Sequence, residues 1–244
     1  MGRRSGPPNS ARVDPVCLIT GAGGRLGNAL CARLMNRSHI VAVYRERVPA
    51  VPSQLRMRVN GDNHRSVYCV QADLRKRDDI RRVIEIALAR YGRIDVLVNS
   101  AADIRFHGKL IELWETDPYA SAQMHLNCVA PMLLASAIFQ DSWKDSRQAN
   151  LRRNRCIVNV SSKSGLDVYG TSGQAFYGAS KAALNLLTRY LAAELEPYGI
   201  RANALCPGGF RDTKSTSAVV DEIEKLINSK QNGVVLEMPV AGSG

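Results

Sequence analysis

Apolar residues along the chain follow two alternating patterns. Short runs of about five residues, mostly β-branched and apolar, occur at 16–20, 40–44, 67–70, 94–98, 156–160 and 200–205. Such runs predict strands that are buried on both faces. Between them, apolar residues recur at helical spacing at 26–35, 78–90, 124–139 and 179–194. A short helix at 219–227 and a last strand at 233–238 complete the pattern.

The alternation of strands and helices predicts an α/β fold. We expect a single-domain, doubly wound parallel sheet of the Rossmann type, with helices on both faces. The length of 244 residues fits one such domain. Residues 1–14 are polar and rich in Gly, Pro and Arg, so we expect a flexible N-terminal arm followed by the domain at 15–240. Pro49 and Pro52 limit any helix after the second strand to a short one.

Composition narrows the class of protein. The chain is 45% hydrophobic and 23% charged, as globular domains are. No stretch approaches the roughly 18 apolar residues of a membrane span, and no apolar run follows the N-terminal arginines, so we expect neither a span nor a signal peptide. The six cysteines form no C-x-x-C pair and no metal-finger spacing, which predicts buried reduced thiols, no metal site and a cytoplasmic protein.

The chain is basic, with a net charge of +11 spread over patches at 75–77, 81–82 and 144–155. Aromatic residues make up only 6% and do not interleave with these patches, as stacking on nucleic acid would require. We therefore interpret the patches as solvated faces and expect no nucleic-acid partner. Salt-dependent binding of polyanions is the alternative.

A glycine-rich loop, Thr20-Gly21-Ala22-Gly23-Gly24-Arg25-Leu26-Gly27, lies between the first strand and the first helix. Free backbone N–H groups and the dipole at a helix N-terminus favour a pyrophosphate. Glycines let the backbone approach the phosphates and let the helix pack on the strand. The loop therefore predicts dinucleotide binding.

The end of the second strand bears on which dinucleotide binds. An acidic residue there normally holds the adenosine ribose, but Tyr44 has that place and Arg45 follows it. Arg45 and, from the glycine loop, Arg25 could pair with a 2′-phosphate, so we expect NADP(H) as the cofactor. In the alternative readings, Arg45 and Arg47 are ordinary surface arginines, or Glu46 turns inward instead.

Tyr177 and Lys181 stand four residues apart at the start of an apolar helix, so they share one face. An ammonium close to a phenol lowers the phenol's pKa, and such a pair can exchange a proton with an alcohol or carbonyl oxygen. Upstream, the strand at 156–160 runs into Ser161 and Ser162. Their place is the carboxyl edge of the sheet, where open α/β sheets bind ligands.

Taken together, these motifs resemble the short-chain dehydrogenase/reductase family over roughly residues 15–210. The resemblance implies that Tyr177 donates and accepts the proton, that Lys181 lowers its pKa and binds the nicotinamide ribose, and that Ser162 binds the substrate oxygen. It also implies that Asn127 holds a water linking Lys181 to solvent. Besides Tyr177 and Lys181, the cofactor-binding residues it implies are Gly21, Gly23, Gly24, Arg25, Leu26, Tyr44, Arg45, Asp73, Leu74, Asn99, Ala101, Pro207 and Gly208.

Several positions depart from the family's pattern. Ser162 stands two residues farther from Tyr177 than is usual; Ser164 has the usual spacing and is the second candidate for the catalytic serine. Ala102 replaces a glycine in the turn after the fourth strand, so we expect that turn to differ locally. The Arg25-Leu26-Gly27 ending resembles the pteridine-reductase branch, which uses NADPH.

The largest departure follows Pro207-Gly208, where a short segment replaces the family's substrate lid. We therefore expect an NADP(H)-dependent oxidoreductase that interconverts a carbonyl and an alcohol on a bulky or carrier-bound substrate. A low-activity binding or scaffold subunit with the same fold is the alternative. The apolar helices at 124–139 and 179–194 predict a homodimer or homotetramer. His107 could touch substrate but is more simply a loop residue.

Overall fold

One parallel sheet forms the centre of the protein. The computed structural model describes residues 14–51, 66–105, 108–168, 173–209 and 212–238. Its seven strands lie in the order β3-β2-β1-β4-β5-β6-β7, and every neighbouring pair is parallel. The strands are β1 (Val16–Thr20), β2 (His39–Tyr44), β3 (Val67–Gln71), β4 (Val96–Asn99), β5 (Cys156–Val160), β6 (Arg201–Cys206) and β7 (Val235–Glu237).

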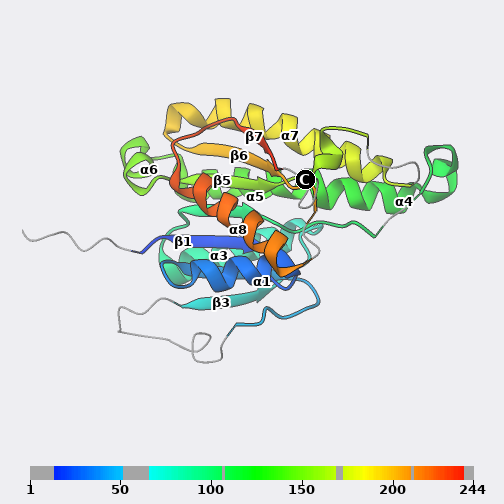
Figure 1. Ribbon diagram of the computed structural model, residues 1–244. Helices are drawn as coiled ribbons and strands as arrows, with labels where there is room; N and C mark the ends of the chain where they lie inside the picture. The colour runs from blue at the N-terminus through cyan, green and yellow to red at the C-terminus, as the bar shows by residue number, and fades with distance from the viewer. Residues whose placement is uncertain (1–13, 52–65, 106–107, 169–172, 210–211, 239–244) are drawn as a thin grey trace, which may run out of the picture.

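Helices cover both faces of this sheet (Figure 1). The α-helices are α1 (Arg25–Leu34), α3 (Arg77–Tyr91), α4 (Leu113–Met124), α5 (Ala130–Ile138), α6 (Arg147–Arg153), α7 (Ala175–Leu195) and α8 (Thr213–Asn228). Shorter turns are η1 (Leu110–Glu112), η2 (His125–Val129), η3 (Phe139–Trp143), η4 (Lys163–Gly165) and η5 (Glu196–Tyr198), of which η2 and η3 are π-helical.

Alternate side chains of β1 enter two separate hydrophobic cores. Val16 and Leu18 pack with side chains of α3, α5 and α7. Cys17 and Ile19 pack with side chains of α1 and α8 on the opposite face. Because both faces of the strand are buried, its sequence is apolar from Val16 to Ile19 and ends in the buried Thr20. The predicted doubly wound sheet is thereby confirmed.

The structure differs from the predicted elements mainly in its helices. All seven strands overlap their predicted ranges, although β4 begins at Val96 rather than 94. Helix α4 mixes exposed apolar side chains, such as Trp114 at 97%, with polar ones, so it gives almost no apolar periodicity to read. Helix α6 lies within the basic stretch at 144–155, for which the sequence predicts no helix. Ser146 caps its N-terminus by accepting a hydrogen bond from the Ala149 N–H.

The run from Asp117 to Trp143 is a continuous helix with the length and mean hydropathy, 1.3, of a membrane span. Half of it is buried inside the domain, with Leu134, Ile138 and Trp143 in the core against α3 and α7. Packing in the interior of the domain therefore accounts for its apolar composition, and the length alone is weak support for a span.

A buried carboxylate holds the strand starts together at the amino edge of the sheet. Asp95 is 1% exposed, and its Oδ2 accepts hydrogen bonds from the Val16 N–H and from Arg93 Nε, each at 3.0 Å. Arg155, also buried, places its Nε 3.5 Å from Asp95 Oδ1. These contacts join the starts of β1, β4 and β5, on the far side of the sheet from the candidate site.

All six cysteines are free thiols; five are buried, as predicted, whereas Cys69 is partly exposed. Among the described residues, no cluster of three or more His, Cys, Asp or Glu could hold a metal ion. The predicted N-terminal arm lies outside the described residues except for Asp14, and so does His107.

Candidate active site

The glycine loop sits where the carboxyl ends of β1 and β4 meet. Thr20 Oγ1 accepts hydrogen bonds from the N–H groups of Ser100 and Ala101, at 3.0 and 3.1 Å. Gly21 has a φ of +66°, and a Cβ on it would lie 2.8 Å from the Ala101 Cα. Only glycine fits there, because the two loops touch through their backbones.

The next glycines shape an anion site at the start of α1. A Cβ on Gly23 would lie 1.8 Å from the Arg47 carbonyl oxygen, whereas a Cβ on Gly24 would meet only the Gly21 carbonyl oxygen, at 3.2 Å. Gly24 is the N-cap of α1, and no side chain caps this helix. No acidic residue stands in its first turn. The exposed N–H groups thus fit the pyrophosphate of a dinucleotide.

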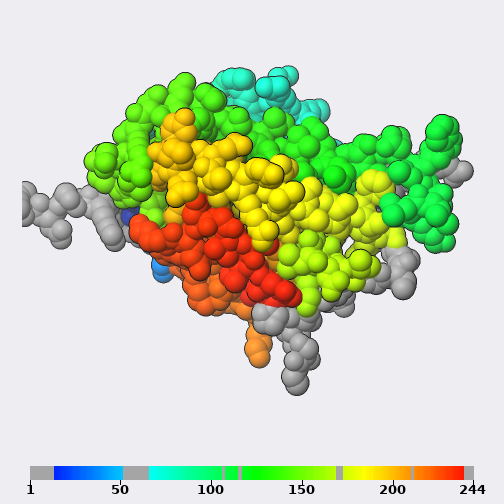
Figure 2. Space-filling model, turned by 90° about the horizontal axis from the view of Figure 1, so that it is seen from above, coloured from blue at the N-terminus to red at the C-terminus, as the bar shows by residue number. Residues whose placement is uncertain are grey.

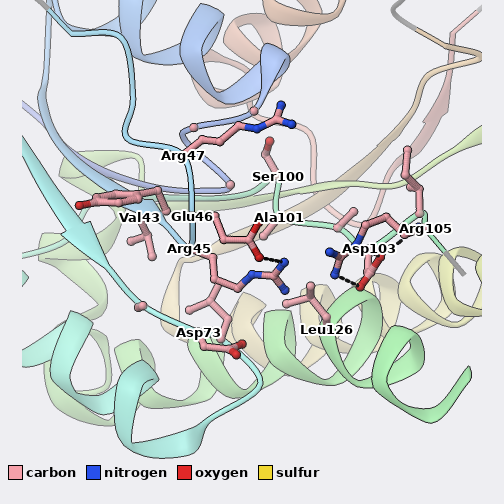
Figure 3. Close-up of a pocket in the computed structure, with 18 residues that line it drawn as sticks. Val43, Arg45, Glu46, Arg47, Asp73, Ser100, Ala101, Asp103, Arg105 and Leu126 are labelled. Carbon is pink, nitrogen blue, oxygen red and sulfur yellow. Dashed lines mark hydrogen bonds and ion pairs between the residues drawn. The ribbon is translucent and has the colours of Figure 1, made fainter. Parts of the chain in front are cut away.

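Beside this loop lies a pocket of about 310 Å³ (Figure 3). Of the predicted cofactor residues, eight line it: Gly21, Gly23, Gly24, Tyr44, Arg45, Asp73, Leu74 and Ala101. The other lining residues were not among the predicted cofactor-binding residues: Val43, Glu46, Arg47, Ala72, Ser100, Ala102, Asp103, Ile104, Arg105 and Leu126. Most of these follow a strand end, a position that could have marked them.

Seven predicted cofactor residues do not line the pocket: Arg25, Leu26, Asn99, Tyr177, Lys181, Pro207 and Gly208. Arg25 lines a different groove, between α1 and α8, where its charge helps the capping bonds of Ser215 to lower the pKa of Asp212. It begins α1, and its side chain is directed to α8 rather than to β2. Leu26 is buried in the core under the loop. Asn99 is also buried, donating a 2.8 Å hydrogen bond to Asn159 Oδ1.

Three arginine–carboxylate pairs surround the pocket. Arg45 pairs with Glu46, Arg75 with Asp73 at 2.6 Å, and Arg105 with Asp103 at 2.9 Å. The hydrogen bonds from Arg75 lower the pKa of the Asp73 carboxyl to about 2, with a smaller contribution from Arg45. The Asp73 carboxylate is therefore ionised at neutral pH.

The turn containing Ala102 needs no glycine in this chain. Among the described residues, Asn154 is the only non-glycine with a positive φ, so Ala102 has an ordinary backbone conformation. The turn is held by Asn127, whose side chain accepts from the Asp103 N–H at 2.7 Å and donates to the Asp103 carbonyl at 2.9 Å.

Asn127 lies between the β4 loop and α7, and the water that the resemblance implies beside it stays a prediction. Besides its bonds to Asp103, its Nδ2 donates to Ser180 Oγ at 3.1 Å, inside α7. Ser180 in turn donates to the Tyr177 carbonyl at 2.7 Å. With these bonds the amide of Asn127 clamps the β4 loop to α7, through the π-helical turn η2. Its side-chain amide is taken up by protein groups rather than aimed at Lys181.

Ser162 and Tyr177 come together at the carboxyl end of β5. Burial raises the pKa of the Tyr177 phenol, and its hydrogen bond with Ser162 acts in the opposite direction. Ser164 instead lines a second pocket with Gly108, Ile111 and other residues, a set that does not include Tyr177. The geometry thus favours Ser162 over Ser164 as the hydroxyl beside the phenol.

Two glycines allow this close approach. A Cβ on Gly165 would lie 2.6 Å from the Lys181 carbonyl carbon, and a Cβ on Gly178 would lie 2.8 Å from the Ser164 carbonyl oxygen. Side chains at either position would push η4 away from α7. The two glycines therefore keep Ser162 within reach of Tyr177.

Lys181 is buried beneath Tyr177. It is 2% exposed, its Nζ lies 5.9 Å from the centroid of the Tyr177 ring, and it donates a 2.9 Å hydrogen bond to the Val160 carbonyl. Burial lowers the pKa of its ammonium to about 8. Contrary to the expectation from sequence, the pKa of Tyr177 is raised, because its own burial outweighs the neighbouring groups.

The segment after β6 borders the same edge. Pro207 is buried, and its carbonyl accepts a hydrogen bond from the Lys163 N–H at 3.0 Å. Only residues 207–212 separate β6 from α8. Pro207 and Gly208 do not line the dinucleotide pocket, the pocket beside Ser164 or the groove between α1 and α8.

Comparison with known proteins identifies the family. Residues 15–224 match the family model for short chain dehydrogenases. The chain is 32% identical over 216 residues to a 3-oxoacyl-[acyl-carrier-protein] reductase of Bos taurus, covering 87% of this chain and 82% of that protein. It is 31% identical over 198 residues to sorbitol-6-phosphate 2-dehydrogenase of Klebsiella pneumoniae, covering 80% and 68%.

Solved structures are similar over most of their length. A 4-hydroxyisoleucine dehydrogenase complexed with NADH superposes with a TM-score of 0.74 at 25% identity, covering 95% of this chain and all of that one. An oxidoreductase of Brucella ovis in complex with a partially ordered NAD gives 0.71 at 25% identity, covering 93% and 100%. With its seven-stranded parallel sheet, its glycine loop and the match over residues 15–224, the chain belongs to the short chain dehydrogenase family of oxidoreductases.

Proposed function

We propose that the protein is an NADP(H)-dependent oxidoreductase that interconverts a carbonyl and an alcohol. The observation that carries this proposal is the group formed by Ser162, Tyr177 and Lys181 at the carboxyl edge of the sheet, joined to the dinucleotide pocket through Asn127 and Asp103. A nicotinamide cofactor, when bound, supplies or accepts the hydride. The remaining chemistry belongs to the protein's own side chains.

Tyr177 is the proton donor to the substrate oxygen in the direction of reduction. Its raised pKa keeps the phenol protonated at neutral pH, which suits a general acid. Ser162 holds the same substrate oxygen by its hydroxyl and stabilises the charge that develops there. Lys181, with a pKa of about 8, gives the site a cation when protonated, and this cation stabilises the phenolate that remains after Tyr177 has given its proton to the substrate oxygen.

The glycine loop and the pocket beside it would hold the dinucleotide. Gly23, Gly24 and the first N–H groups of α1 suit its pyrophosphate, and Leu74 and Asp73 line the part of the pocket suited to adenosine. Arg45 supports a preference for NADP(H), because a guanidinium pairs well with a 2′-phosphate. Two similar solved structures hold NAD or NADH, so both cofactors belong in the test.

We propose a bulky or carrier-bound substrate. The short segment 207–212 supports an open cleft, since it offers no room for a lid of two helices. Similar proteins include 3-oxoacyl-[acyl-carrier-protein] reductases from Bos taurus and Thermotoga maritima. The Arg25-Leu26-Gly27 ending supports a pteridine-type substrate less strongly, because the Arg25 side chain lies outside the pocket.

Self-association and a cytoplasmic location are further parts of the proposal. Large apolar side chains are exposed on η2 and α7: Val129 at 42%, Leu186 at 55% and Tyr190 at 61%. Helix α7, in yellow, crosses the face of the molecule that Figure 2 shows. A second copy that covers them would form a homodimer or homotetramer. Sedimentation of the purified protein tests this, and a monomer across the micromolar range would contradict it.

The alternative function is a scaffold subunit with little turnover. The short segment 207–212 favours it, because an open cleft excludes water poorly. Binding of NADPH without turnover of free or carrier-bound ketones would support this alternative.

The test of the proposed function combines binding and turnover. NADPH should stabilise the protein against heat at lower concentration than NADH does. With an active ketone, Tyr177→Phe should lower kcat by about 100-fold or more, since it removes the acid. Ser162→Ala should lower kcat similarly, while Ser164→Ala serves as the matched control. Equal losses in the two serine variants would contradict the assignment of Ser162.

A further inference from the structure

The charged side chains lining the dinucleotide pocket balance one another. Three are basic (Arg45, Arg47 and Arg105) and three are acidic (Glu46, Asp73 and Asp103). Asp73 and Asp103 each have an arginine of their own, Arg75 and Arg105. A phosphate carries a charge of about −2 at neutral pH, so a guanidinium that turns from its carboxylate partner toward the phosphate would favour binding.

Arg45 is the guanidinium with the most easily replaced partner. Its side chain is 29% exposed and reaches into the pocket toward Asp103, while the Glu46 carboxylate that it contacts is 68% exposed (Figure 3). Arg47 extends away from this pair in the same view. Among the described residues, Arg45 has no other carboxylate partner within 4.0 Å. An exposed pair of this kind is worth less than about 1 kcal/mol, so a doubly charged anion can compete with it.

The backbone around Arg45 is fixed, which leaves the side chains as the moving parts. The Arg45 carbonyl accepts a hydrogen bond from Gln71 Nε2 at 2.9 Å, and the Tyr44 carbonyl accepts from the Ala72 N–H at 2.8 Å. Two residues on, the Arg47 carbonyl packs against Gly23 with no room for a Cβ. A change of partner by Arg45 therefore needs only rotation about side-chain bonds.

We propose that the Glu46 carboxylate binds the Arg45 guanidinium where the 2′-phosphate of a dinucleotide would otherwise bind. Glu46 and this phosphate then compete for Arg45. Glu46 is thereby a specificity-determining residue that restrains the preference for phosphorylated dinucleotides. The inference rests on the proposed function, since it assumes that adenosine binds in this pocket. It goes further because it assigns a role in specificity to Glu46, whose charge is opposite to that of Arg45, the residue that attracts the phosphate.

Binding of two adenosine fragments tests the competition without turnover. Adenosine 2′,5′-bisphosphate and adenosine 5′-monophosphate differ only in the 2′-phosphate, and calorimetry gives the affinity of each. Glu46→Gln should tighten binding of the bisphosphate about three- to fivefold, the value of one exposed ion pair, and change that of the monophosphate less than about twofold. Glu222→Gln is the control, because Glu222 pairs with Lys225 on the surface of α8, outside the pocket.

A second variant separates competition for Arg45 from simple repulsion by Glu46. In an Arg45→Gln background, the gain from Glu46→Gln should fall to less than about half, because no guanidinium is left to release. An undiminished gain would overturn the inference, as would a Glu46→Gln variant that binds the bisphosphate no more tightly than the wild type does. Failure of the proposed function looks different: the wild type would then bind neither fragment, and both proposals would fall.

Discussion

Replacing Lys181 by methionine should make the protein more stable in a pH-dependent way. Lys181 is 2% exposed, and burial lowers its pKa from the usual 10.5 to about 8. Each pKa unit corresponds to 1.36 kcal/mol, so the charged side chain costs the folded state about 3 kcal/mol. This cost is fully present below pH ~8 and disappears as the pH rises toward ~10.5, because the folded protein then releases the proton first.

Methionine has a similar length and carries no charge, so it avoids this cost. It also leaves the Val160 carbonyl without its 2.9 Å bond from Nζ, a loss that does not depend on pH. The stability of Lys181→Met relative to the wild type should therefore fall by about 2 kcal/mol between pH ~6.5 and pH ~9.5.

Urea unfolding at several pH values measures this difference, and other titrating groups cancel because both proteins share them. Lys225→Met is the matched control, because Lys225 is an exposed lysine on α8 and should show no such trend. A difference between Lys181→Met and wild type that stays constant with pH would refute the reasoning, since Lys181 would then titrate as an ordinary lysine.

Other substitutions test the loop and the amino edge of the sheet. Gly23→Ala should destabilise the protein by about 1–3 kcal/mol and weaken binding of adenosine 5′-monophosphate, because its Cβ would lie 1.8 Å from the Arg47 carbonyl oxygen. Gly24→Ala is the control for stability, because the nearest contact of its Cβ, to the Gly21 carbonyl oxygen, is 3.2 Å. Equal changes in melting temperature in the two variants would contradict the packing argument. Asp95→Asn should cost about 3–5 kcal/mol in urea unfolding, because it leaves Arg93 and Arg155 beside a neutral group. Asp221→Asn, which removes a 45%-exposed partner of Arg33, should cost less than about 1 kcal/mol; a similar loss in both would argue against a special role for the buried cluster.

Much of the fold could be predicted from the sequence because the central strands are buried on both faces. Such strands are mostly apolar, as β1 and β5 are apart from Thr20 and Asn159, and this pattern survives in the sequence alone. Helix α4 escaped prediction for the opposite reason. Its exposed side chains are under no demand to be apolar, so its sequence carries little periodicity.

Some residues of the candidate site could likewise be predicted from the sequence, because the local backbone requires their type or their spacing. Gly21 is needed at a positive φ against Ala101, and Tyr177 and Lys181 face the same way because they lie one helical turn apart. These requirements are local, so a short stretch of sequence expresses them.

Only the tertiary structure decided how the remaining groups act. The direction of the Arg25 side chain depends on α8, which lies far along the chain, and the use of the Asn127 amide depends on Asp103 and Ser180. The pKa of Tyr177 is raised rather than lowered because burial is a property of the whole packed domain. The sequence by itself determined the sheet, the glycine loop and the Tyr–Lys pair, since these follow from local spacing and continuous burial. Contacts between distant segments, and the desolvation that they cause, set the charges and partners of the site.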